Sequence, residues 1–431
     1  MCLKIFEKKY QNGAGDYTIP LVRLDVMPEN TPDELKYLYD FSIVDNGLDY
    51  LGHPDAILLK DGSILDVYPS GHGKGAIRSS ISRDGGVTYT DKIENMPKSW
   101  ETSRETPTIY RLEFADGSPD KILLISGNPD WHDGKGSIGG FNFSLSDDEG
   151  KTWSEFELCF SKKDKVTVLP IVSMASLTRL KENGKFVDKW MAFFHDHWGG
   201  FINYKTILSF ENGKAVWSTP EPYFKKYRRI EKKAKMCEVE VIRSDMGKGD
   251  ELCLIARSNH KSYNSLISFS NDEGKTWSEP RFVPCALNGE RHKADYTPDG
   301  RLFITFRSIE RDKDKIKRNS VEKMKTWYSE GWVAWVGTYE DLKNGTEGQY
   351  RIKLAHTYLD KQTEPHISAN ADTGYCGNVV FEDGMIVTST YGKFGEKNSD
   401  GEYKTYVASK RLKLSDVDKE PSTAITIKPA I

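Results

Sequence analysis

Ser270-Asn271-Asp272-Glu273-Gly274-Lys275-Thr276-Trp277 is the stretch that decides the fold, because its pattern S-x-D-x-G-x-T-W returns elsewhere in the 431-residue chain. A second copy runs from Ser146 to Trp153, and a third, from Ser82 to Tyr89, ends in Tyr. A fourth, degenerate copy from Ser209 to Trp217 has Glu211 at the acidic position. Such internal repeats indicate a fold built from one supersecondary unit used several times.

The repeated unit is a turn element and carries no reactive group. Its Asp can accept hydrogen bonds from its own turn, its Gly can adopt a left-handed backbone, and its aromatic residue can fold back onto the hairpin. We therefore expect Asp84, Asp148 and Asp272 to be structural. The acidic positions follow one another at intervals of 64, 63 and 61 residues, a period that suits a four-stranded propeller blade with long loops.

Tight turns between apolar runs indicate the number of blades. An Asp-Gly or Asn-Gly pair in this setting is a strong hairpin signal. The turns are Asp61-Gly62, Asp116-Gly117, Asn183-Gly184, Asp245 to Gly249, Asp299-Gly300 and Asp383-Gly384. They predict an all-β fold, a six-bladed β-propeller of four-stranded antiparallel blades, with a seven-bladed ring as the alternative.

The domain organisation that follows is a single propeller domain over residues 51–431, preceded by an N-terminal segment, residues 1–50, that closes the propeller. The clearest strand-like stretch of this segment runs from Tyr17 to Val26. We expect it to complete the last blade, at an edge position because Pro20 cannot donate a ladder hydrogen bond.

Composition excludes several functions. The formal net charge of −3 is nearly balanced, so neither a nucleic-acid partner nor a membrane surface is indicated. No G-x-G-x-x-G follows a strand and no P-loop is present, so no cofactor is expected. The first residues lack the apolar core of a signal peptide, and the six cysteines form no C-x-x-C pair, which favours a cytoplasmic protein with reduced thiols. Nothing in the sequence indicates the oligomeric state.

In a propeller, the segments before each first strand and after each second strand lie at the same end of the ring. Residues in these segments are therefore candidates for one functional site. Histidines, arginines and aromatic residues accumulate in these segments and suit proton transfer, carboxylate binding and stacking on sugars. The candidates are His53, His72, Lys74, Trp131, His132, His195, His197, Trp198, Glu238, Arg257, Arg291, His292, Arg307 and Tyr375. Glu105, Asp372 and Tyr391 stand in the same segments without an assigned role.

A metal is the competing use of these histidines. His195 and His197, with His132 and Asp133, are the residues that could supply ligands. No H-E-x-x-H motif or Cys/His spacing of a zinc site accompanies them. We therefore expect no metal.

The eight-residue units resemble the Asp-box (BNR) repeats of the sialidase superfamily over about residues 50–410. Residues 237–241 followed by 254–258 are similar to the sialidase strand pair that ends in the second carboxylate-binding arginine, which implies this role for Arg257. The segment 373–376 resembles the one that carries the sialidase tyrosine nucleophile, which implies this role for Tyr375. Glu238 is then a shifted substitute for the glutamate that activates the tyrosine.

The chain departs from the sialidase pattern in its first blade. His53 stands where the first arginine is expected, and His72 and Lys74 stand where the catalytic aspartate is expected. The spacing of the two histidines resembles, more weakly, propeller lyases and glycosidases that act on ulvan and on rhamnose–glucuronate linkages. The resemblance therefore implies the sialidase fold, while the catalytic chemistry is expected to differ from that of sialidases.

The favoured hypothesis is cleavage of a short oligosaccharide with a carboxylate sugar, a uronate, by elimination. Arg257, helped by Arg291 or Arg307, would neutralise the carboxylate, His72 supported by His53 would remove the adjacent proton, and Tyr375 or a protonated histidine would assist the departing oxygen. Two alternatives stay open. One is a sialidase-type hydrolase with Tyr375 as nucleophile activated by Glu238, and the other is a non-catalytic propeller that binds an acidic sugar.

Overall fold

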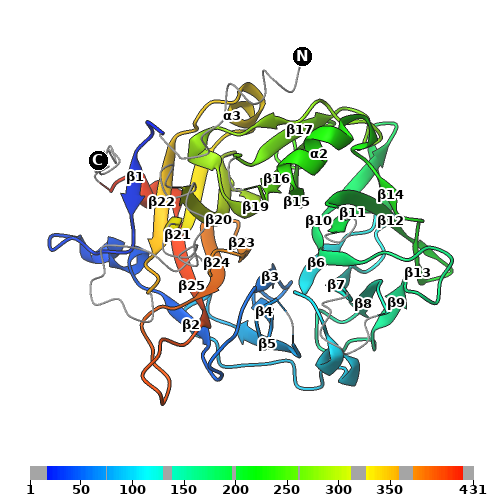
Figure 1. Ribbon diagram of the computed structural model, residues 1–431. Helices are drawn as coiled ribbons and strands as arrows, with labels where there is room; N and C mark the ends of the chain where they lie inside the picture. Colours follow the sequence, from blue (N-terminus) through cyan, green and yellow to red (C-terminus); the bar gives the residue numbers. More distant parts are fainter. Residues whose placement is uncertain are drawn as a thin grey trace.

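The computed structural model describes residues 17–73, 75–129, 138–196, 200–260, 263–311, 327–358 and 372–420. Over these ranges the chain forms six small sheets arranged around a common axis (Figure 1). The predicted six-bladed β-propeller is therefore confirmed. Within the described ranges, no helix combines the length and the apolar character needed to cross a membrane.

The first three blades follow one another along the chain. The first blade consists of β3 (Asp55–Leu58), β4 (Ile64–Pro69) and β5 (Ile77–Ser82). The second consists of β6 (Thr108–Leu112), β7 (Lys121–Gly127), β8 (Phe141–Ser146) and β9 (Glu157–Cys159). The third consists of β10 (Pro170–Glu182), β11 (Lys185–Asp196), β12 (Ile202–Glu211) and β13 (Lys214–Trp217), with β14 (Glu221–Pro222) also paired to β12.

The last three blades continue in the same order. The fourth consists of β15 (Met236–Arg243), β16 (Leu252–Ser258), β17 (Leu266–Ser270) and β18 (Arg281–Phe282). The fifth contains β19 (Glu290–Tyr296), β20 (Leu302–Arg311), β21 (Trp327–Gly337) and β22 (Tyr350–Ala355). The sixth contains β23 (Cys376–Val380), β24 (Met385–Gly392) and β25 (Tyr406–Lys413).

Short helices occupy connections between strands, and one, α4, follows the last strand. The α-helices are α2 (Arg228–Ala234), α3 (Tyr339–Asn344) and α4 (Leu414–Val417). The 3-10 helices are η1 (Asp33–Leu38), η2 (Lys98–Thr102), η3 (Lys225–Tyr227) and η4 (Cys285–Leu287).

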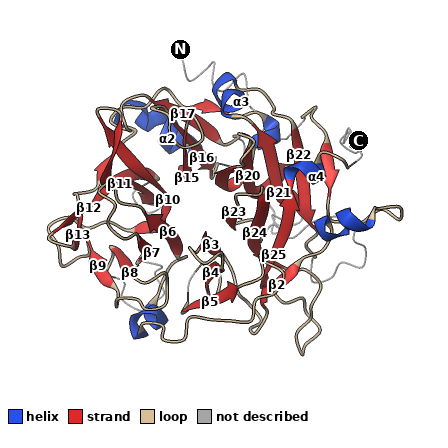
Figure 2. Cartoon of the chain, turned by 180° about the vertical axis from the view of Figure 1, so that it is seen from behind, coloured by secondary structure: helices blue, strands red, loops and turns tan. Residues whose placement is uncertain are grey.

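The first strand of each blade lies nearest the axis (Figures 1 and 2). These inner strands contact one another all the way round, in the order β3, β6, β10, β15, β19, β23 and back to β3. The hydrophobic core lies between neighbouring blades. Between the first two, for example, Leu65 and Val67 of β4 pack with Ile122 and Leu124 of β7 in one buried cluster.

All the turns used to predict the blades connect a first strand to a second strand. Asp61-Gly62 lies between β3 and β4, and Asn183-Gly184 lies between β10 and β11. Asn183 has a φ of 53° and Gly184 a φ of 73°, which is the left-handed pair that a two-residue hairpin requires. The local signal was reliable because these turns need residues that tolerate positive φ.

The repeated eight-residue units are hydrogen-bonded turns, as the sequence predicts. Asp272 accepts hydrogen bonds from the Thr276 backbone N–H at 2.8 Å and from its hydroxyl at 2.6 Å. The Gly274 N–H donates to the Ser270 hydroxyl at 2.9 Å. Asp148 and Asp84 make the same bonds to the threonine four residues further on.

The degenerate unit is different. Lys214 pairs with Glu211 directly across Asn212-Gly213, which leaves a two-residue hairpin between β12 and β13. Glu211 is therefore a strand residue and not the acidic member of a box, because the chain has already reversed where a box would continue.

The N-terminal segment contributes to two blades. β1 (Leu21–Arg23) pairs in parallel with β22 and belongs to the fifth blade. The expectation that the stretch from Tyr17 to Val26 completes the last blade is therefore wrong. Val22 and Leu24 are buried there against Trp332 and Ile352. The strand on the last blade is β2 (Ser42–Asp45), which pairs with β25. The division into residues 1–50 and 51–431 stays a prediction.

Candidate functional site

Backbone kinks at the inner strands place the central side chains. His53, Glu238 and Arg291 have φ values of 51°, 48° and 55°. Strand register shifts at Glu238 on β15 and between Glu290 and Lys293 on β19. A bulge re-aims a side chain, and a non-glycine residue with positive φ costs about 1–3 kcal/mol, a strain that collects at functional sites. The kinks recur at equivalent places in the first, fourth and fifth blades.

Tyr375, Glu238 and Arg257 form a compact hydrogen-bonded group. The Tyr375 hydroxyl donates to Glu238 Oε2 at 2.7 Å, and Arg257 Nη1 donates to the Tyr375 oxygen at 2.6 Å. Arg257 Nη1 also lies 2.8 Å from Glu238 Oε1. Burial alone would raise the pKa of Glu238, but the charges of Arg257 and His195 outweigh it and hold this pKa at about 2. Glu238 is therefore an ionised acceptor for the Tyr375 proton.

Glu290 joins this group to Arg307. Its Oε2 lies 3.1 Å from Arg257 Nη2 and 3.1 Å from Arg307 Nη1, and the residue is only 2% exposed. The Arg307 guanidinium also lies 4.8 Å from the centre of the Tyr375 ring. Glu290 is not among the residues that the sequence pattern indicated.

His53 is held at both ring nitrogens. The Gly73 backbone N–H donates to Nδ1 at 3.0 Å, so the neutral ring carries its proton on Nε2, which lies 3.0 Å from the Tyr391 hydroxyl oxygen. Tyr391 in turn donates to Asp372 Oδ1 at 2.9 Å. Burial, helped by the neighbouring His72, keeps the pKa of His53 well below its ordinary value. His53 is thus a neutral residue that positions others.

His72 lies in a more open place. Its side chain is 66% exposed, and its Nδ1 lies 2.6 Å from the Tyr50 hydroxyl and 3.3 Å from Asp372 Oδ1. Because Tyr50 donates its own proton to Asp372 Oδ2 at 2.6 Å, Nδ1 of His72 must carry a proton. In the neutral ring, Nε2 is then the basic nitrogen.

Glu105 is another buried carboxyl group at the axis. It lies just before β6 and is 1% exposed, and its Oε1 accepts the Thr106 backbone N–H at 2.7 Å. A methyl group on Gly73 would lie 3.7 Å from Glu105 Oε1 and 4.0 Å from His53 Cε1, so these residues adjoin. Burial raises the pKa of Glu105 to about 7, with a further contribution from the charge of Glu238.

The structure separates the other candidates. His195 is buried at the end of β11, parallel to the Phe201 ring, and its charge acts on Glu238. Arg291 is also buried and interacts with the acidic groups of Asp55 and Glu240, so Arg307 is the arginine that Glu290 joins to Arg257. Lys74, Trp131, His132, His197 and Trp198 lie outside the described residues.

His292 differs most from its predicted role. It is fully buried, its Nε2 lies 2.9 Å from the Leu287 carbonyl oxygen, and its ring packs against Phe306. Burial lowers the pKa of His292 to about 4. In this structure it is a core histidine that a ligand cannot contact, because the bulge at Arg291 turns the two neighbouring side chains in different directions.

A metal-like grouping occurs at one place among the described residues. One ligand atom each from His53, His72 and Asp372 lies within 4.8 Å of the others. However, both ring nitrogens of His53 already make hydrogen bonds, to Gly73 and Tyr391. His53 can offer a lone pair to a cation only if one of these bonds breaks, so the donor set fits a hydrogen-bond network better than a metal site.

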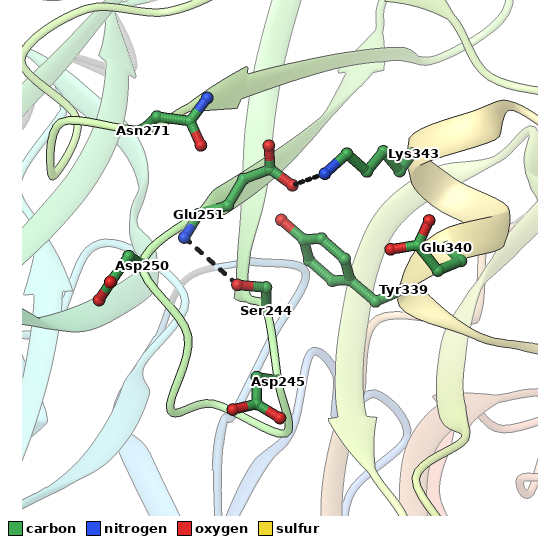
Figure 3. A pocket seen from close by; sticks show the side chains of 8 residues that line it. All are labelled: Ser244, Asp245, Asp250, Glu251, Asn271, Tyr339, Glu340 and Lys343. Atoms are coloured by element: carbon green, nitrogen blue, oxygen red, sulfur yellow. Dashed lines mark hydrogen bonds and ion pairs between the residues drawn. The ribbon is translucent and has the colours of Figure 1, made fainter.

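A cavity of about 520 Å³ lies away from this centre (Figure 3). It is formed by the loop between β15 and β16, one Asp-box turn and α3. Its lining is Ser244, Asp245, Asp250, Glu251, Asn271, Tyr339, Glu340 and Lys343. Since β15 runs from Met236 to Arg243, this cavity lies at the opposite end of the blade from Glu238 and contains none of the candidate residues.

Sequence reasoning missed several members of the central group. Asp372, Tyr391 and Glu105 stood in the correct segments, but nothing in their neighbourhood distinguished them from other polar residues. Glu290 directly precedes Arg291 and could have been found by extending the pre-strand segment by one residue. Tyr50 carries no local signal, because its partners His72 and Asp372 are far from it in sequence.

The protein is thus a six-bladed propeller with a group of buried ionisable side chains at its axis. No protein-family model and no curated protein matches the chain. Solved structures do match. A Dyadobacter fermentans protein of unknown function has a TM-score of 0.55 and 15% identity over 86% of this chain and 97% of its own.

Two further matches have named activities. An α-L-arabinofuranosidase from Fusarium graminearum has a TM-score of 0.53 and 13% identity, over 86% of this chain and 94% of its own. The NanB sialidase from Streptococcus pneumoniae has a TM-score of 0.50 and 11% identity, over 87% of this chain and 71% of its own. At these identities the matches show the shared fold.

Proposed function

We propose that the protein is a glycoside hydrolase, with Glu105 as general acid and the Tyr375–Glu238 pair as nucleophile and base. The observation that carries this proposal is a pair of buried, electrostatically coupled carboxyl groups with opposite pKa shifts. The pKa of Glu238 is about 2 and that of Glu105 about 7. Two carboxyl groups whose pKa values differ in this way can take the separate acid and base roles of glycoside hydrolysis.

The reaction proceeds in two balanced steps. First, the Tyr375 oxygen attacks the anomeric carbon and its proton passes to Glu238, while Glu105 gives its proton to the departing glycosidic oxygen. The product is a glycosyl–tyrosine and a free alcohol. Then water attacks the same carbon, gives one proton to Glu105, and releases Tyr375, which recovers its proton from Glu238. One water is consumed overall.

Arg257 makes the attack by Tyr375 feasible. Burial raises the pKa of Tyr375 well above its ordinary value, so its hydroxyl is protonated in the resting protein. Arg257 Nη1 lies 2.6 Å from the phenolic oxygen. It therefore stabilises the negative charge that develops as the proton moves to Glu238.

Two findings support a carbohydrate as the substrate. The propeller fold is shared with an arabinofuranosidase and a sialidase, whose activities are glycosidic. The acid–base group lies at the axis, where the loops of several blades converge. A small glycoside or oligosaccharide is therefore the proposed ligand.

A second candidate function is elimination at a uronate, which the sequence alone favoured. The observation in its favour is His72, whose exposed ring is oriented through Nδ1 by Tyr50 and Asp372 and so has Nε2 as its base. In this candidate, His72 Nε2 removes the proton next to the sugar carboxylate and the glycosidic oxygen departs with a proton from Tyr375.

The experiment is a screen of neutral and acidic aryl glycosides and oligosaccharides with mass detection. Hydrolysis adds one water to the products, whereas elimination adds none and produces the ultraviolet absorbance of an unsaturated uronate. A 2-deoxy-2-fluoro glycoside should then trap a glycosyl adduct on the peptide that contains Tyr375. Saturable binding without turnover would instead indicate a non-catalytic sugar-binding propeller and would contradict both candidates.

A further inference from the structure

The position between the two central arginines is already taken by a carboxylate of the chain. Glu290 Oε2 lies 3.1 Å from Arg257 Nη2 and 3.1 Å from Arg307 Nη1. Two guanidinium groups that share one carboxylate form the geometry by which a protein would bind the carboxylate of an acidic sugar. Here the bound carboxylate is a buried side chain on β19, only 2% exposed.

Other groups of the chain also contact these two arginines. Arg257 pairs with Glu238 as well as Glu290, and Arg307 donates to the Tyr391 hydroxyl at 2.8 Å and to the Thr373 carbonyl at 2.7 Å. Asp372 Oδ1 lies 3.8 Å from Arg307 Nη2. The two guanidinium groups therefore already face three carboxylates, so an additional buried anion would have to displace one of these carboxylates or share its cation.

Two further cations, both on β19, also have acidic neighbours. Lys293 Nζ lies 3.2 Å from Asp55 Oδ1, and the charges of Asp55 and Glu240 act on Arg291. Lys293 can therefore pair with a ligand carboxylate only by leaving Asp55.

We infer that the site accepts an uncharged glycosyl ring and that Glu290 is the residue that excludes sugars bearing a carboxylate. This inference rests on the proposed function and narrows its substrate class. It also replaces the uronate expected from the sequence, which required Arg257, with the help of Arg291 or Arg307, to bind the substrate carboxylate. A neutral ring needs hydrogen-bond partners but no positively charged partner. Arg257 can therefore stay paired with Glu290 and still stabilise the Tyr375 oxygen.

The test uses ligand pairs that differ in one group, a CH₂OH or a carboxylate at the same carbon. Aryl glucosides are compared with aryl glucuronides and aryl galactosides with aryl galacturonides, and an aryl arabinofuranoside and an aryl sialoside are added to the panel. Turnover is measured with the wild type, and binding is measured by calorimetry with the Tyr375→Phe variant. We expect the neutral member of a pair to be preferred by about 10- to 100-fold, the value of one charge-assisted hydrogen bond.

The Glu290→Gln variant tests the assigned residue. It keeps the size of the side chain but removes its charge, so the acidic-to-neutral ratio of binding should rise by about 10-fold or more. The matched control is Glu251→Gln, which changes a glutamate paired with Lys343 at 3.2 Å, at the opposite end of the blade (Figure 3). It should leave the ratio unchanged.

The outcomes separate the two proposals. If no glycoside of either class is turned over, the hydrolase proposal is wrong, and the binding ratio still decides the inference. An acidic ligand that binds the Tyr375→Phe protein as tightly as its neutral partner overturns the inference, as does a failure of both members to bind. If Glu290→Gln does not fold, the binding ratio of the Tyr375→Phe protein is measured against ionic strength. A ratio that favours the neutral ligand at every salt concentration supports the inference, whereas one that reverses at low salt overturns it.

Discussion

The Tyr375 hydroxyl lies 2.7 Å from Glu238 Oε2, although the two residues are 137 positions apart and belong to different blades. Tyr375 immediately precedes β23 of the sixth blade, and Glu238 lies on β15 of the fourth. The ring brings them together because both stand at the same end of an inner strand. The contact couples a phenol to an ionised carboxylate and to the Arg257 guanidinium.

Replacing Tyr375 by Phe should remove the proposed nucleophile without removing its ring. We expect kcat on the best substrate of the glycoside panel to fall by at least about 10²-fold, the lower end for an acid–base residue, while the melting temperature changes little. The control is Tyr68→Phe, another buried tyrosine, which lies on β4 of the first blade and whose hydroxyl is bonded to Asp45 and Ser80. It should lose some stability and keep its kcat. Equal kcat values in the two variants would contradict the assignment.

If Glu105 is the general acid, kcat/KM should depend on pH in a specific way. Its pKa is raised to about 7, so a general acid at this position is protonated below pH 7 and loses its proton above it. We expect kcat/KM to fall as pH rises through about 7. Glu105→Gln, which cannot transfer a proton, should lower kcat/KM by about 10²- to 10⁴-fold and abolish this limb.

The matched control for Glu105 is Glu240→Gln. Glu240 is also buried, and burial likewise raises its pKa to about 7, but it accepts the Ala294 N–H on the neighbouring inner strand. Its replacement should leave the alkaline limb in place. An alkaline limb that persists in Glu105→Gln and disappears in Glu240→Gln would assign the titrating group to Glu240 instead.

The fold could be predicted because its signals are local. Each hairpin between a first and a second strand needs residues that tolerate positive φ. Two adjacent residues, such as Asp61-Gly62 or Asn183-Gly184, are enough to indicate such a turn. The repeated unit at Ser270 is local as well. Its hydrogen bonds, from Gly274 to Ser270 and from Thr276 to Asp272, lie within seven residues. The path of the N-terminal segment could not be read in this way, because the pairing of β1 with β22 depends on surfaces that meet only in the folded ring.

The site could be predicted only as a region. The repeat pattern predicted that Tyr375, Glu238, Arg257 and His72 lie at one end of the ring, and these residues do approach one another. It could not show that Glu290 occupies the space between two arginines, since the distances depend on bulges of a single residue. His292, which lies within one of these bulges, is buried against Phe306.

Gly374 tests how closely the site is packed. Its φ is +81°, and a Cβ there would lie 2.7 Å from the Arg307 Cα. Gly374→Ala should therefore cost the strain of a left-handed alanine, about 1 kcal/mol, and in addition displace Arg307 or Tyr375, with a loss of kcat. The control is Gly62→Ala, with a φ of +84° and no atom within 4 Å of its Cβ, which should show the strain alone in urea unfolding. Equal losses of stability would mean that the close approach to Arg307 has no energetic effect.

Lys410 should make the stability of the ring depend on pH. Its Nζ donates to the carbonyl oxygens of Leu38 at 2.6 Å and Leu24 at 2.9 Å, which ties β25 to the N-terminal segment. Burial lowers the pKa of Lys410 from its ordinary 10.5 to about 7, against the opposing charges of Asp25 and Asp40. Between these two values the unfolded chain binds more protons than the folded one, so the free energy of unfolding should rise with pH from 7 to about 10.

Urea unfolding at pH 7, 8 and 9 measures this slope. In Lys410→Met the rise should disappear, and stability should fall by about 1–3 kcal/mol for each carbonyl left without a donor. Lys413→Met is the control, because this lysine lies on the same strand but pairs with Asp383 at 2.8 Å with its side chain 29% exposed. It should keep the wild-type slope. A wild-type stability that is flat from pH 7 to 9 would mean that Lys410 remains charged in the folded ring. The bonds to Leu24 and Leu38 would then be those of an ammonium ion.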